Sequence, residues 1–187
     1  MNAYDFDNTI FKGDSTAKFY IFSLKRHKKI LLLTPSLLKG FFRFYLLKKG
    51  TKTEFKEQMY RFLTVSKNIE KDIEDFWEQN KKNIKNFYRN SQQDDDVIIS
   101  ASPEFLLAPI CQKLGIKHLI ASRVDMKTGK YSGLNCHGEE KVKRFREKFG
   151  NVRINEFYSD SYSDTPMAKI AENAFMVKND NISDWKF

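Results

Sequence analysis

The chain has 187 residues and a formal net charge of +9; 41% of its residues are hydrophobic, 14% are aromatic and only four are proline. This composition excludes an intrinsically disordered chain, and the length allows one domain, or one domain with a moderate insertion. The two cysteines, Cys111 and Cys136, are far apart and match no metal-ligand spacing, which argues against a disulfide framework or a zinc site and predicts a reducing, cytoplasmic location.

The first predicted element is a short strand that leads into YDFDNTI, residues 4–10. The chain reaches this strand almost directly from Met1, so we expect no secretory signal peptide. Two carboxylates, Asp5 and Asp7, stand two residues apart at the strand end. If the strand continues, both side chains point the same way along the pleat. A turn beginning at Phe6 would instead offer the carbonyl of Asp7 to a metal and leave its side chain for proton transfer.

The pattern of residues 15–90 predicts helices, because apolar residues recur there at three- and four-residue intervals. The helical stretches read STAKFYIFSLKR, LKGFFRFYLLKK, KTEFKEQMYRFL and IEKDIEDFWEQNKKNIKNFY. Thr53 and Ser66 are expected near helix starts, and Gly50 at a helix stop.

The longest apolar stretch, Ile30 to Leu47, contains Pro35, Lys39, Gly40 and Arg43. Charges and a proline at these positions argue against a membrane-spanning helix. Two interpretations stay open. The stretch is either a buried helix pair, or an interfacial amphipathic helix whose cations meet lipid headgroups at the surface of a membrane.

Positive charge is concentrated in the same part of the chain. Between Ser15 and Gln93 there are 18 Lys or Arg against 7 Asp or Glu, a net charge of +11 that leaves −2 for the remainder. A basic segment in a near-neutral frame favours an anionic partner, such as a phosphate ester, an anionic lipid or a nucleic acid. A lysine-rich, solvated surface without any partner is the alternative.

Residues 91–187 alternate short strands with helices of about ten residues. The expected strands are VIIS at 97–100, IKHLIAS, INEFYS and FMVK; the expected helices are PEFLLAPICQKLG, EEKVKRFREKFG and DTPMAKIAENA. A β-hairpin with its turn at Thr128-Gly129 is expected in RVDMKTGKYSGLNC. This alternation predicts an α/β fold with a parallel sheet. The core would be discontinuous, formed by residues 1–14 and 91–187, with a helical insertion over 15–90.

Ligands of open parallel sheets bind at the carboxyl ends of the strands, and polar residues gather there in this chain. The residues expected at these ends are Asp5 and Asp7, Ser100 with Ala101 and Ser102 opening a helix, Lys141, and Asp160 with Asp164. A single Asp at a strand end is most often a helix cap. Helix capping explains a single residue of this kind better than it explains all of these residues together.

The chemistry of this set fits phosphoryl transfer through an aspartyl phosphate. Three carboxylates around one point, from Asp5, Asp160 and Asp164, require a hard cation such as Mg²⁺. A carboxylate can then attack phosphorus while the metal and a lysine neutralise the charge of the transferring group. Ser100 and the amides that follow it would donate hydrogen bonds to phosphoryl oxygens.

The segments DFDNT, VIISAS, EEKVKRF and YSDSYSD, in this order, resemble the four motifs of the haloacid dehalogenase superfamily of phosphatases. The pattern of strands, helices and motifs along the chain is most similar to that of the phosphoserine phosphatase-like branch, which has a helical cap inserted after the first motif. The resemblance covers the whole chain. It implies a Rossmann-like three-layer core and a Mg²⁺-dependent phosphomonoester hydrolase. Asn8 stands where the family commonly has glycine, and asparagine tolerates left-handed backbone geometry.

The resemblance also implies a role for each matched residue. Asp5 corresponds to the nucleophile that becomes phosphorylated, and Asp7 to the general acid that protonates the leaving oxygen and then activates water. Ser100 and Lys141 match the hydroxyl of the second motif and the lysine of the third. The phosphate-binding residues would be Ser100, Ala101, Ser102 and Lys141.

Metal and substrate contacts follow from the same resemblance. Mg²⁺ would be bound by Asp5, Asp160 and the carbonyl of Asp7, with Asp164 as the acidic residue that supports the metal site. The candidates for substrate contact, on the basic insertion and its entry, are Asp14, Lys18 and Arg43.

Three functions compete at this stage. The first is hydrolysis of a small-molecule or lipid-linked phosphate, and the second is phosphoryl transfer to an alcohol instead of water. The third is a binding protein whose basic insertion holds anionic lipid or nucleic acid. The intact catalytic set favours an enzyme, so nucleic acid is not expected as a partner; peripheral membrane contact through the insertion is compatible with either enzyme.

Overall fold

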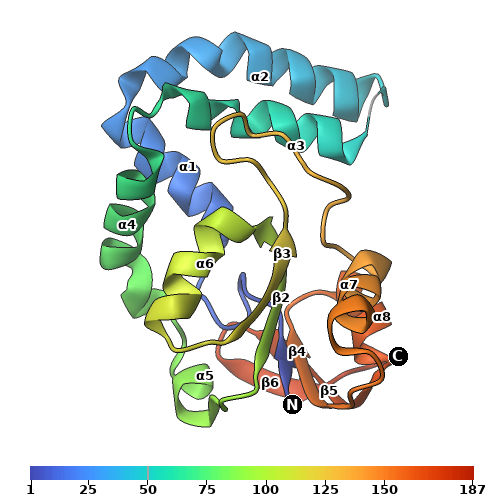
Figure 1. Cartoon of the computed structure of the whole chain (residues 1–187). Helices are drawn as coiled ribbons and strands as arrows, with labels where there is room; N and C mark the ends of the chain where they lie inside the picture. Colours follow the sequence, from blue (N-terminus) through green and yellow to red (C-terminus); the bar gives the residue numbers. More distant parts are fainter. Residues whose placement is uncertain (50) are drawn as a thin grey trace.

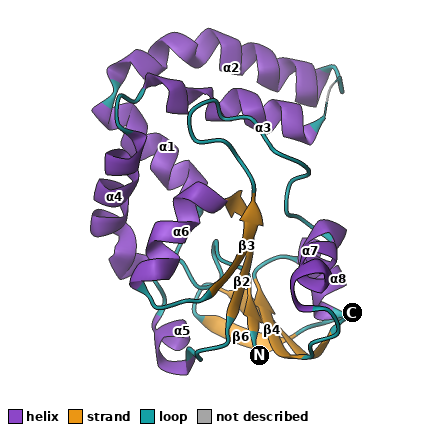
Figure 2. Cartoon of the chain, viewed as in Figure 1, coloured by secondary structure: helices purple, strands orange, loops and turns teal. Residues whose placement is uncertain are grey.

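The computed structural model describes residues 1–49 and 51–187, without the side chains of Arg43, Tyr45 and Lys52. Its centre is a six-stranded sheet with the order β3-β2-β1-β4-β5-β6 (Figures 1 and 2). Strands β1 to β5 run parallel, and β6 is antiparallel to β5. The strands are β1 (Ala3–Tyr4), β2 (Val97–Pro103), β3 (His118–Ser122), β4 (Ile154–Ser159), β5 (Ala171–Lys178) and β6 (Asn181–Asp184). The predicted α/β class is confirmed.

The central strands are apolar on both faces, as expected for a parallel sheet covered by helices. Val97, Ile98 and Ile99 of β2 are completely buried, as are Ala3 and Tyr4 of β1. Both neighbours of β1 come from the second half of the sequence, because β1 pairs with β2 on one side and with β4 on the other. Strand β1 therefore lies inside the sheet, and the chain leaves the sheet from there to form the helices that follow.

The helical elements fall into two groups along the chain. The first group is α1 (Ser15–Arg26), η1 (Lys28–Leu33), α2 (Thr34–Phe41), η2 (Phe42–Leu46), α3 (Lys52–Tyr60), η3 (Arg61–Val65), α4 (Ile69–Asn80), η4 (Lys81–Asn83) and α5 (Asn86–Ser91). The second group is α6 (Glu104–Lys113), α7 (Glu139–Phe149), η5 (Tyr162–Asp164) and α8 (Thr165–Ala168). Helices α1 to α3 arch over one end of the sheet, whereas α5 lies at its opposite end (Figure 1).

Several helix boundaries in the structure differ by a few residues from the predicted ones. Helix α3 starts after Thr51, which forms a capping box with Glu54, rather than near Thr53. Helix α4 is capped by Asn68 rather than by Ser66. Gly50, the expected helix stop, lies outside the described residues.

Two predicted elements after β3 are wrong in extent. The helix expected over residues 164–174 ends at Ala168, because Ala171 pairs with Ile154 and begins β5. The hairpin expected over residues 123–136 is shorter than predicted. Its arms pair antiparallel at Val124 and Tyr131, and at the turn the amide of Gly129 donates to the carbonyl of Asp125 at 2.7 Å.

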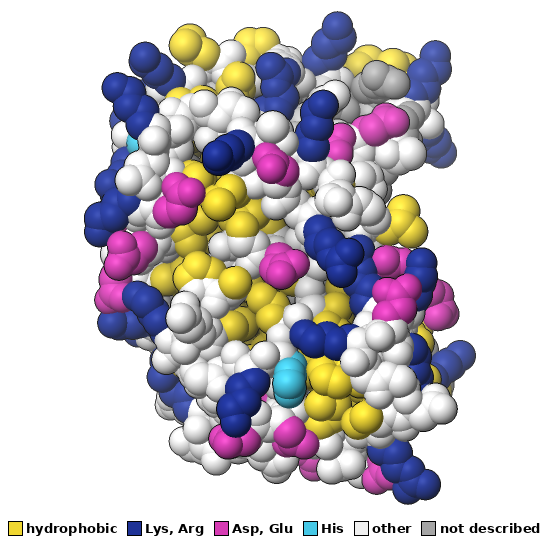
Figure 3. Space-filling view, viewed as in Figure 1, with side chains coloured by type: hydrophobic (Ala, Val, Ile, Leu, Met, Phe, Trp, Pro, Cys, Tyr) yellow, Lys and Arg dark blue, Asp and Glu magenta, His cyan; other side chains and the backbone are white. Residues whose placement is uncertain are grey.

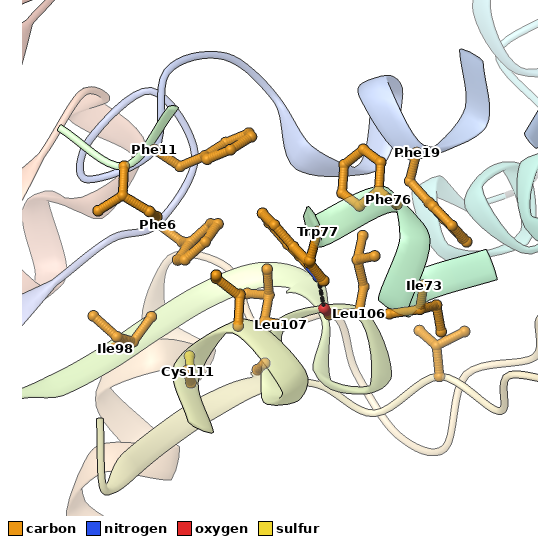
Figure 4. Close-up of a cluster of buried hydrophobic side chains, with 14 of the residues drawn as sticks. Phe6, Phe11, Phe19, Ile73, Phe76, Trp77, Ile98, Leu106, Leu107 and Cys111 are labelled. Carbon is orange, nitrogen blue, oxygen red and sulfur yellow. Dashed lines mark hydrogen bonds between the residues drawn. The ribbon is translucent and has the colours of Figure 1, made fainter. Parts of the chain in front are cut away.

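One hydrophobic cluster joins the sheet to the helices that precede β2. Trp77 of α4 packs edge-on against Phe6 and Phe11, which follow β1, and its Nε1 donates a hydrogen bond to the carbonyl of Leu106, with 2.6 Å between the atoms (Figure 4). Phe76 extends this packing to Phe19 of α1. The helices over the sheet are therefore fixed by aromatic side chains next to the strand that carries Asp5 and Asp7. No helix among the described residues has the length and apolar character needed to cross a bilayer.

Candidate active site

Asp5 is the first residue after β1, and the chain turns immediately after it. The amides of Ile10 and Phe11 both donate to the carbonyl of Phe6, with distances of 3.1 and 3.0 Å. Asn8 has a φ of 55°, the left-handed geometry expected at this position. Of the two alternatives left open by the sequence, the turn at Phe6 is therefore the one found. Asp5 and Asp7 do not continue one strand.

Lys141 joins two buried carboxylates. Its Nζ lies 2.7 Å from Oδ1 of Asp5 and 2.7 Å from Oδ2 of Asp164, and all three residues are buried. Lys141 enters from the first turn of α7, and Asp164 from η5, after β4. Ser159, the last residue of β4, donates a second hydrogen bond to Oδ2 of Asp164, at 2.8 Å. Three of the predicted residues thus meet as one ion cluster.

Burial and charge determine how these groups ionise. Burial raises the pKa of Asp5 to about 7, Lys141 counteracts this shift, and the negative charge of Asp164 adds to it. Burial alone would lower the pKa of Lys141, but the two adjacent carboxylates hold it above its ordinary value. Lys141 is therefore a permanent cation at the end of the sheet.

Asp7 is held on the other side of the turn by residues of two elements. Its Oδ1 accepts a hydrogen bond from the backbone amide of Ser15 at 2.7 Å, and its Oδ2 accepts one from the hydroxyl of Ser102 at 2.5 Å. Burial raises the pKa of Asp7 to about 6, the negative charge of Asp14 adds to this, and the hydrogen bonds from Ser102 and Ser15 lower it. A carboxyl group with such a pKa can donate and accept a proton near neutral pH.

The second motif lies at the carboxyl end of β2, but not where a helix opens. Strand β2 continues to Pro103, and α6 begins at Glu104. The expectation that Ala101 and Ser102 start the helix is therefore wrong. A residue that precedes proline is disfavoured in helical geometry, and Pro103 itself has an extended backbone, with φ −65° and ψ 137°.

Ser100 and Ser102 nevertheless both reach the site. The hydroxyl of Ser100 accepts a hydrogen bond from the amide of Ser102 at 3.1 Å. The hydroxyl of Ser102 also contacts those of Ser15 and Thr16, at 3.3 and 3.0 Å. Ser100, Ala101 and Ser102 all line the same cavity as Asp5 and Asp7.

Asp160 follows β4 and faces the turn after β1. Its amide donates to the hydroxyl of Thr9 at 3.0 Å, and the same hydroxyl lies 3.5 Å from Oδ2 of Asp5. Burial raises the pKa of Asp160, and a hydrogen bond with the side chain of Asn8 acts in the opposite direction. Thr9, a member of the first motif DFDNT, links Asp5 to Asp160 and is not among the predicted site residues.

The expected convergence of three carboxylates on one point is not found. No three His, Cys, Asp or Glu side chains of the described residues form a metal-binding group, since Lys141 lies between Asp5 and Asp164. Asp5 and Asp160 remain as two carboxylates that line the same cavity. This donor set still fits Mg²⁺, which is usually held by one or two carboxylates together with waters and substrate phosphate.

A second observation supports this fit. Oδ1 of Asp164 is buried, and no hydrogen-bond partner for it occurs among the described residues. A buried carboxylate oxygen without a donor is costly, and a hydrated cation nearby would supply that donor.

The site opens into a cavity of about 410 Å³ between the sheet and the helices. Its helical side is lined mainly by apolar and aromatic residues of α1 and α3, among them Tyr20, Ile21, Met59 and Tyr60, with Thr16 and Lys56 as polar members. His137, from the loop before α7, also lines it. Periodicity in the sequence identifies α1 and α3 as helices, but not the face of each that points to Asp5.

The three predicted substrate contacts have different outcomes. Asp14 lines the cavity and caps α1, its Oδ1 accepting a hydrogen bond from the amide of Ala17 at 2.8 Å. Lys18 does not line it, which corrects the prediction: its Nζ donates to the carbonyl of Lys12 at 2.6 Å and lies 5.0 Å from the ring centroid of Phe11. The side chain of Arg43 lies outside the described part of the chain.

A sequence model of the family of haloacid dehalogenase-like hydrolases matches residues 3–169 of this chain. Protein CicA of Caulobacter vibrioides is 40% identical over 82 residues, which cover 41% of this chain and 37% of that protein. A probable phosphatase of Mycobacterium tuberculosis, Rv3661, is 36% identical over 93 residues, covering 46% of this chain and 32% of that protein. The matched segment is thus less than half of either relative.

The fold also has a counterpart among solved structures. A protein of unknown function from Bordetella pertussis Tohama I has a TM-score of 0.71 at 20% identity, covering 93% of this chain and 87% of the other. At this level of identity, the likeness concerns the fold alone. It extends over both the sheet and the helices above it.

Proposed function

This chain belongs to the family of haloacid dehalogenase-like hydrolases, and from this premise we propose that it is a Mg²⁺-dependent phosphomonoester hydrolase that acts through an aspartyl phosphate on Asp5. One observation carries the proposal. A buried carboxylate, Asp5, lies against a permanent cation, Lys141, in the same cavity as a second carboxylate of raised pKa, Asp7. Nucleophile, charge neutralisation and proton carrier are thus close together.

In the first step, a carboxylate oxygen of Asp5 attacks phosphorus and the bond from phosphorus to the ester oxygen breaks. Asp7, protonated at its carboxyl group, gives its proton to the leaving oxygen, so an alcohol departs. In the second step, Asp7 takes a proton from water, the water oxygen attacks phosphorus, and inorganic phosphate leaves Asp5. Lys141 offsets the negative charge of the phosphoryl group, and the Ser100 hydroxyl donates a hydrogen bond to it.

Asp5, Asp160 and the carbonyl of Asp7 would hold Mg²⁺. Bound there, the metal supplies positive charge beside the phosphoryl oxygens. Asp164 has a positioning role in this arrangement, since it holds Lys141 at 2.7 Å from one of its oxygens while Ser159 fixes the same oxygen.

We assign the helical segment over residues 15–90 as a cap that contacts the organic part of the substrate. Tyr20 and Ile21 of α1 and Met59 and Tyr60 of α3 supply an apolar wall opposite the carboxylates. Such a wall favours a phosphate ester with an apolar or aromatic group over a small, highly charged one. A small-molecule phosphate and a lipid-linked phosphate both meet this description.

The test uses the full chain with p-nitrophenyl phosphate, assayed with Mg²⁺ and with EDTA. We expect activity that EDTA abolishes and Mg²⁺ restores, and loss of that activity in Asp5→Asn. A matched control is Asp94→Asn, because the Asp94 side chain is 97% exposed and pairs only with Lys117 among the described residues. Full activity of Asp5→Asn would overturn the covalent mechanism.

Phosphoryl transfer to an alcohol requires the same first step and differs only in the acceptor. Adding glycerol to the assay separates the two, because a transferase would form glycerol phosphate at the expense of inorganic phosphate.

Cys111 and Cys136 are both buried free thiols, and we retain a reducing, cytoplasmic location as part of the proposal.

A further inference from the structure

The outer side of the continuous helical stretch α2–η2 exposes large apolar side chains to solvent. Leu38 of α2 is 63% exposed, and Phe42 and Leu46 of η2 are 51% and 64% exposed; the preceding element η1 adds Leu31 and Leu32, at 55% and 79%. We call these five residues the outer apolar face. Hydrophobic side chains are visible along the edge of the molecule formed by α2, with Lys and Arg side chains projecting beside them (Figure 3). Single exposed leucines are ordinary, whereas a row of them on one helix requires an explanation.

The inner side of the same helix is already occupied. Ser36 accepts a hydrogen bond from Nη1 of Arg61 at 3.0 Å, and a Cβ at Gly40 would lie only 1.8 Å from Oε1 of Gln58. Phe44 stacks on Phe55 of α3, with 5.4 Å between ring centroids. The inner positions 36, 40 and 44 recur every four residues, and so do the outer positions 38, 42 and 46. Each outer position lies two residues after an inner one along the helix. They therefore lie on opposite sides of the helix, and α3 cannot cover the outer apolar face.

The stretch of chain that carries this face has charges of one sign. Residues 15–53 contain ten Lys or Arg and no Asp or Glu. Five lysines that flank the outer apolar face are exposed, and no ion pair among the described residues involves them: Lys28, Lys29, Lys39, Lys48 and Lys49.

We propose that the outer apolar face docks on an anionic lipid bilayer, with its leucines and Phe42 in the acyl boundary and the flanking lysines at the headgroups. Apolar residues on one helix side with unpaired cations beside them are the pattern of an interfacial helix, and each cation near an anionic surface adds attraction. A second copy of the chain is disfavoured, because a two-fold contact would bring the same lysines against one another. Nucleic acid would use the lysines but not the leucines.

The test is flotation of the full chain with vesicles of phosphatidylcholine, with and without phosphatidylglycerol, at low and high salt. We expect binding only to the vesicles with phosphatidylglycerol, reduced by salt because electrostatic attraction is screened. The double variant Leu38→Asp/Phe42→Asp should lower the bound-to-free ratio about tenfold or more. It should keep its thermal unfolding curve and its activity on p-nitrophenyl phosphate, since neither residue lines the cavity.

The matched control is Ile182→Asp/Phe187→Asp, which adds the same two charges at exposed apolar positions, 42% and 79% exposed, at the opposite end of the molecule. Its vesicle binding should equal that of the unsubstituted chain. The proposal is overturned if the unsubstituted chain fails to float, or if the Leu38→Asp/Phe42→Asp variant floats equally well. It is also overturned if sedimentation shows a dimer that this variant converts to a monomer. The readout is independent of catalysis, so an inactive protein that floats would contradict only the proposed hydrolase function.

Discussion

Nζ of Lys141 lies 2.7 Å from Oδ1 of Asp5, although 136 positions separate the two residues in the sequence. The same nitrogen lies 2.7 Å from Asp164, so one buried cation serves two buried carboxylates. In a low-dielectric interior, a buried carboxylate is costly unless a cation lies beside it, and Lys141 is that cation for both.

Replacing Lys141 with methionine should therefore reduce stability as well as activity. The substitution keeps most of the side-chain volume but leaves Asp5 and Asp164 without their cation, which should lower the free energy of unfolding by about 3 kcal/mol. Urea unfolding at neutral pH measures the change. Lys143→Met is the control, because the neighbouring Lys143 is 64% exposed and its one ion pair among the described residues is with Glu147, at 4.0 Å. A loss of less than about 1 kcal/mol in Lys141→Met would contradict the dependence of the two carboxylates on this cation.

The meeting of Asp5, Ser100, Lys141 and Asp164 could be predicted because each follows a strand, or opens a helix, at one end of a parallel sheet. The pairing of Lys141 with Asp164 could not. It depends on the position of η5 relative to α7, and no periodicity encodes that position.

The helical side of the cavity was harder to predict for a related reason. Periodicity predicts the helices of residues 15–90 but not how each is rotated about its own axis. Of the predicted substrate contacts, Asp14 lines the cavity and Lys18 does not. Lys56 and His137 were missed because neither belongs to a motif. Ala101 and Ser102 do not open α6, because β2 continues through both residues to Pro103.

The hydroxyl of Ser102 should matter for turnover and not for substrate binding. Among the described residues it is one of two hydrogen-bond donors to the Asp7 carboxylate, and its loss would free Asp7 to leave the geometry needed for proton transfer. In Ser102→Ala we expect kcat to fall about tenfold with little change in KM, against a fall of about 10² or more for Asp7→Asn. Steady-state kinetics with p-nitrophenyl phosphate measures both. Ser91→Ala, on exposed α5, is the control; a tenfold rise in KM at constant kcat would contradict the positioning role of Ser102.

Gly129 lies where the loop after β3 touches the end of α3. It has a φ of 73°, and a Cβ there would be 2.8 Å from the carbonyl oxygen of Tyr60. Gly129→Ala should therefore displace the loop from α3, where Tyr131 donates its amide to Glu57 at 2.9 Å. We expect a loss of about 1–2 kcal/mol in stability and a raised KM, since Tyr60 lines the cavity.

A second glycine of the same loop separates contact from backbone strain. Gly133 has a φ of 99°, but a Cβ there would meet nothing within 4 Å. Gly133→Ala should cost about 1 kcal/mol through backbone geometry alone and leave KM unchanged. Equal KM values in the two variants would show that the contact with Tyr60 does not shape the cavity.

Asp96, directly before β2, should make stability depend on pH. Its Oδ2 accepts the amide of Gln93 at 2.8 Å, its buried Oδ1 has no partner among the described residues, and burial raises its pKa from 3.8 to about 6. Between these two values the folded state holds a proton that the unfolded state has lost, so stability falls as pH rises through this window and the penalty is constant above it. Asp96→Asn should remove that slope, gaining about 2–3 kcal/mol in the free energy of unfolding at neutral pH and little near pH 4. Urea unfolding at several pH values measures the difference, with Asp94→Asn as the exposed control. If Asp96→Asn retained the slope of the unsubstituted chain, burial of this carboxyl group would not be its cause.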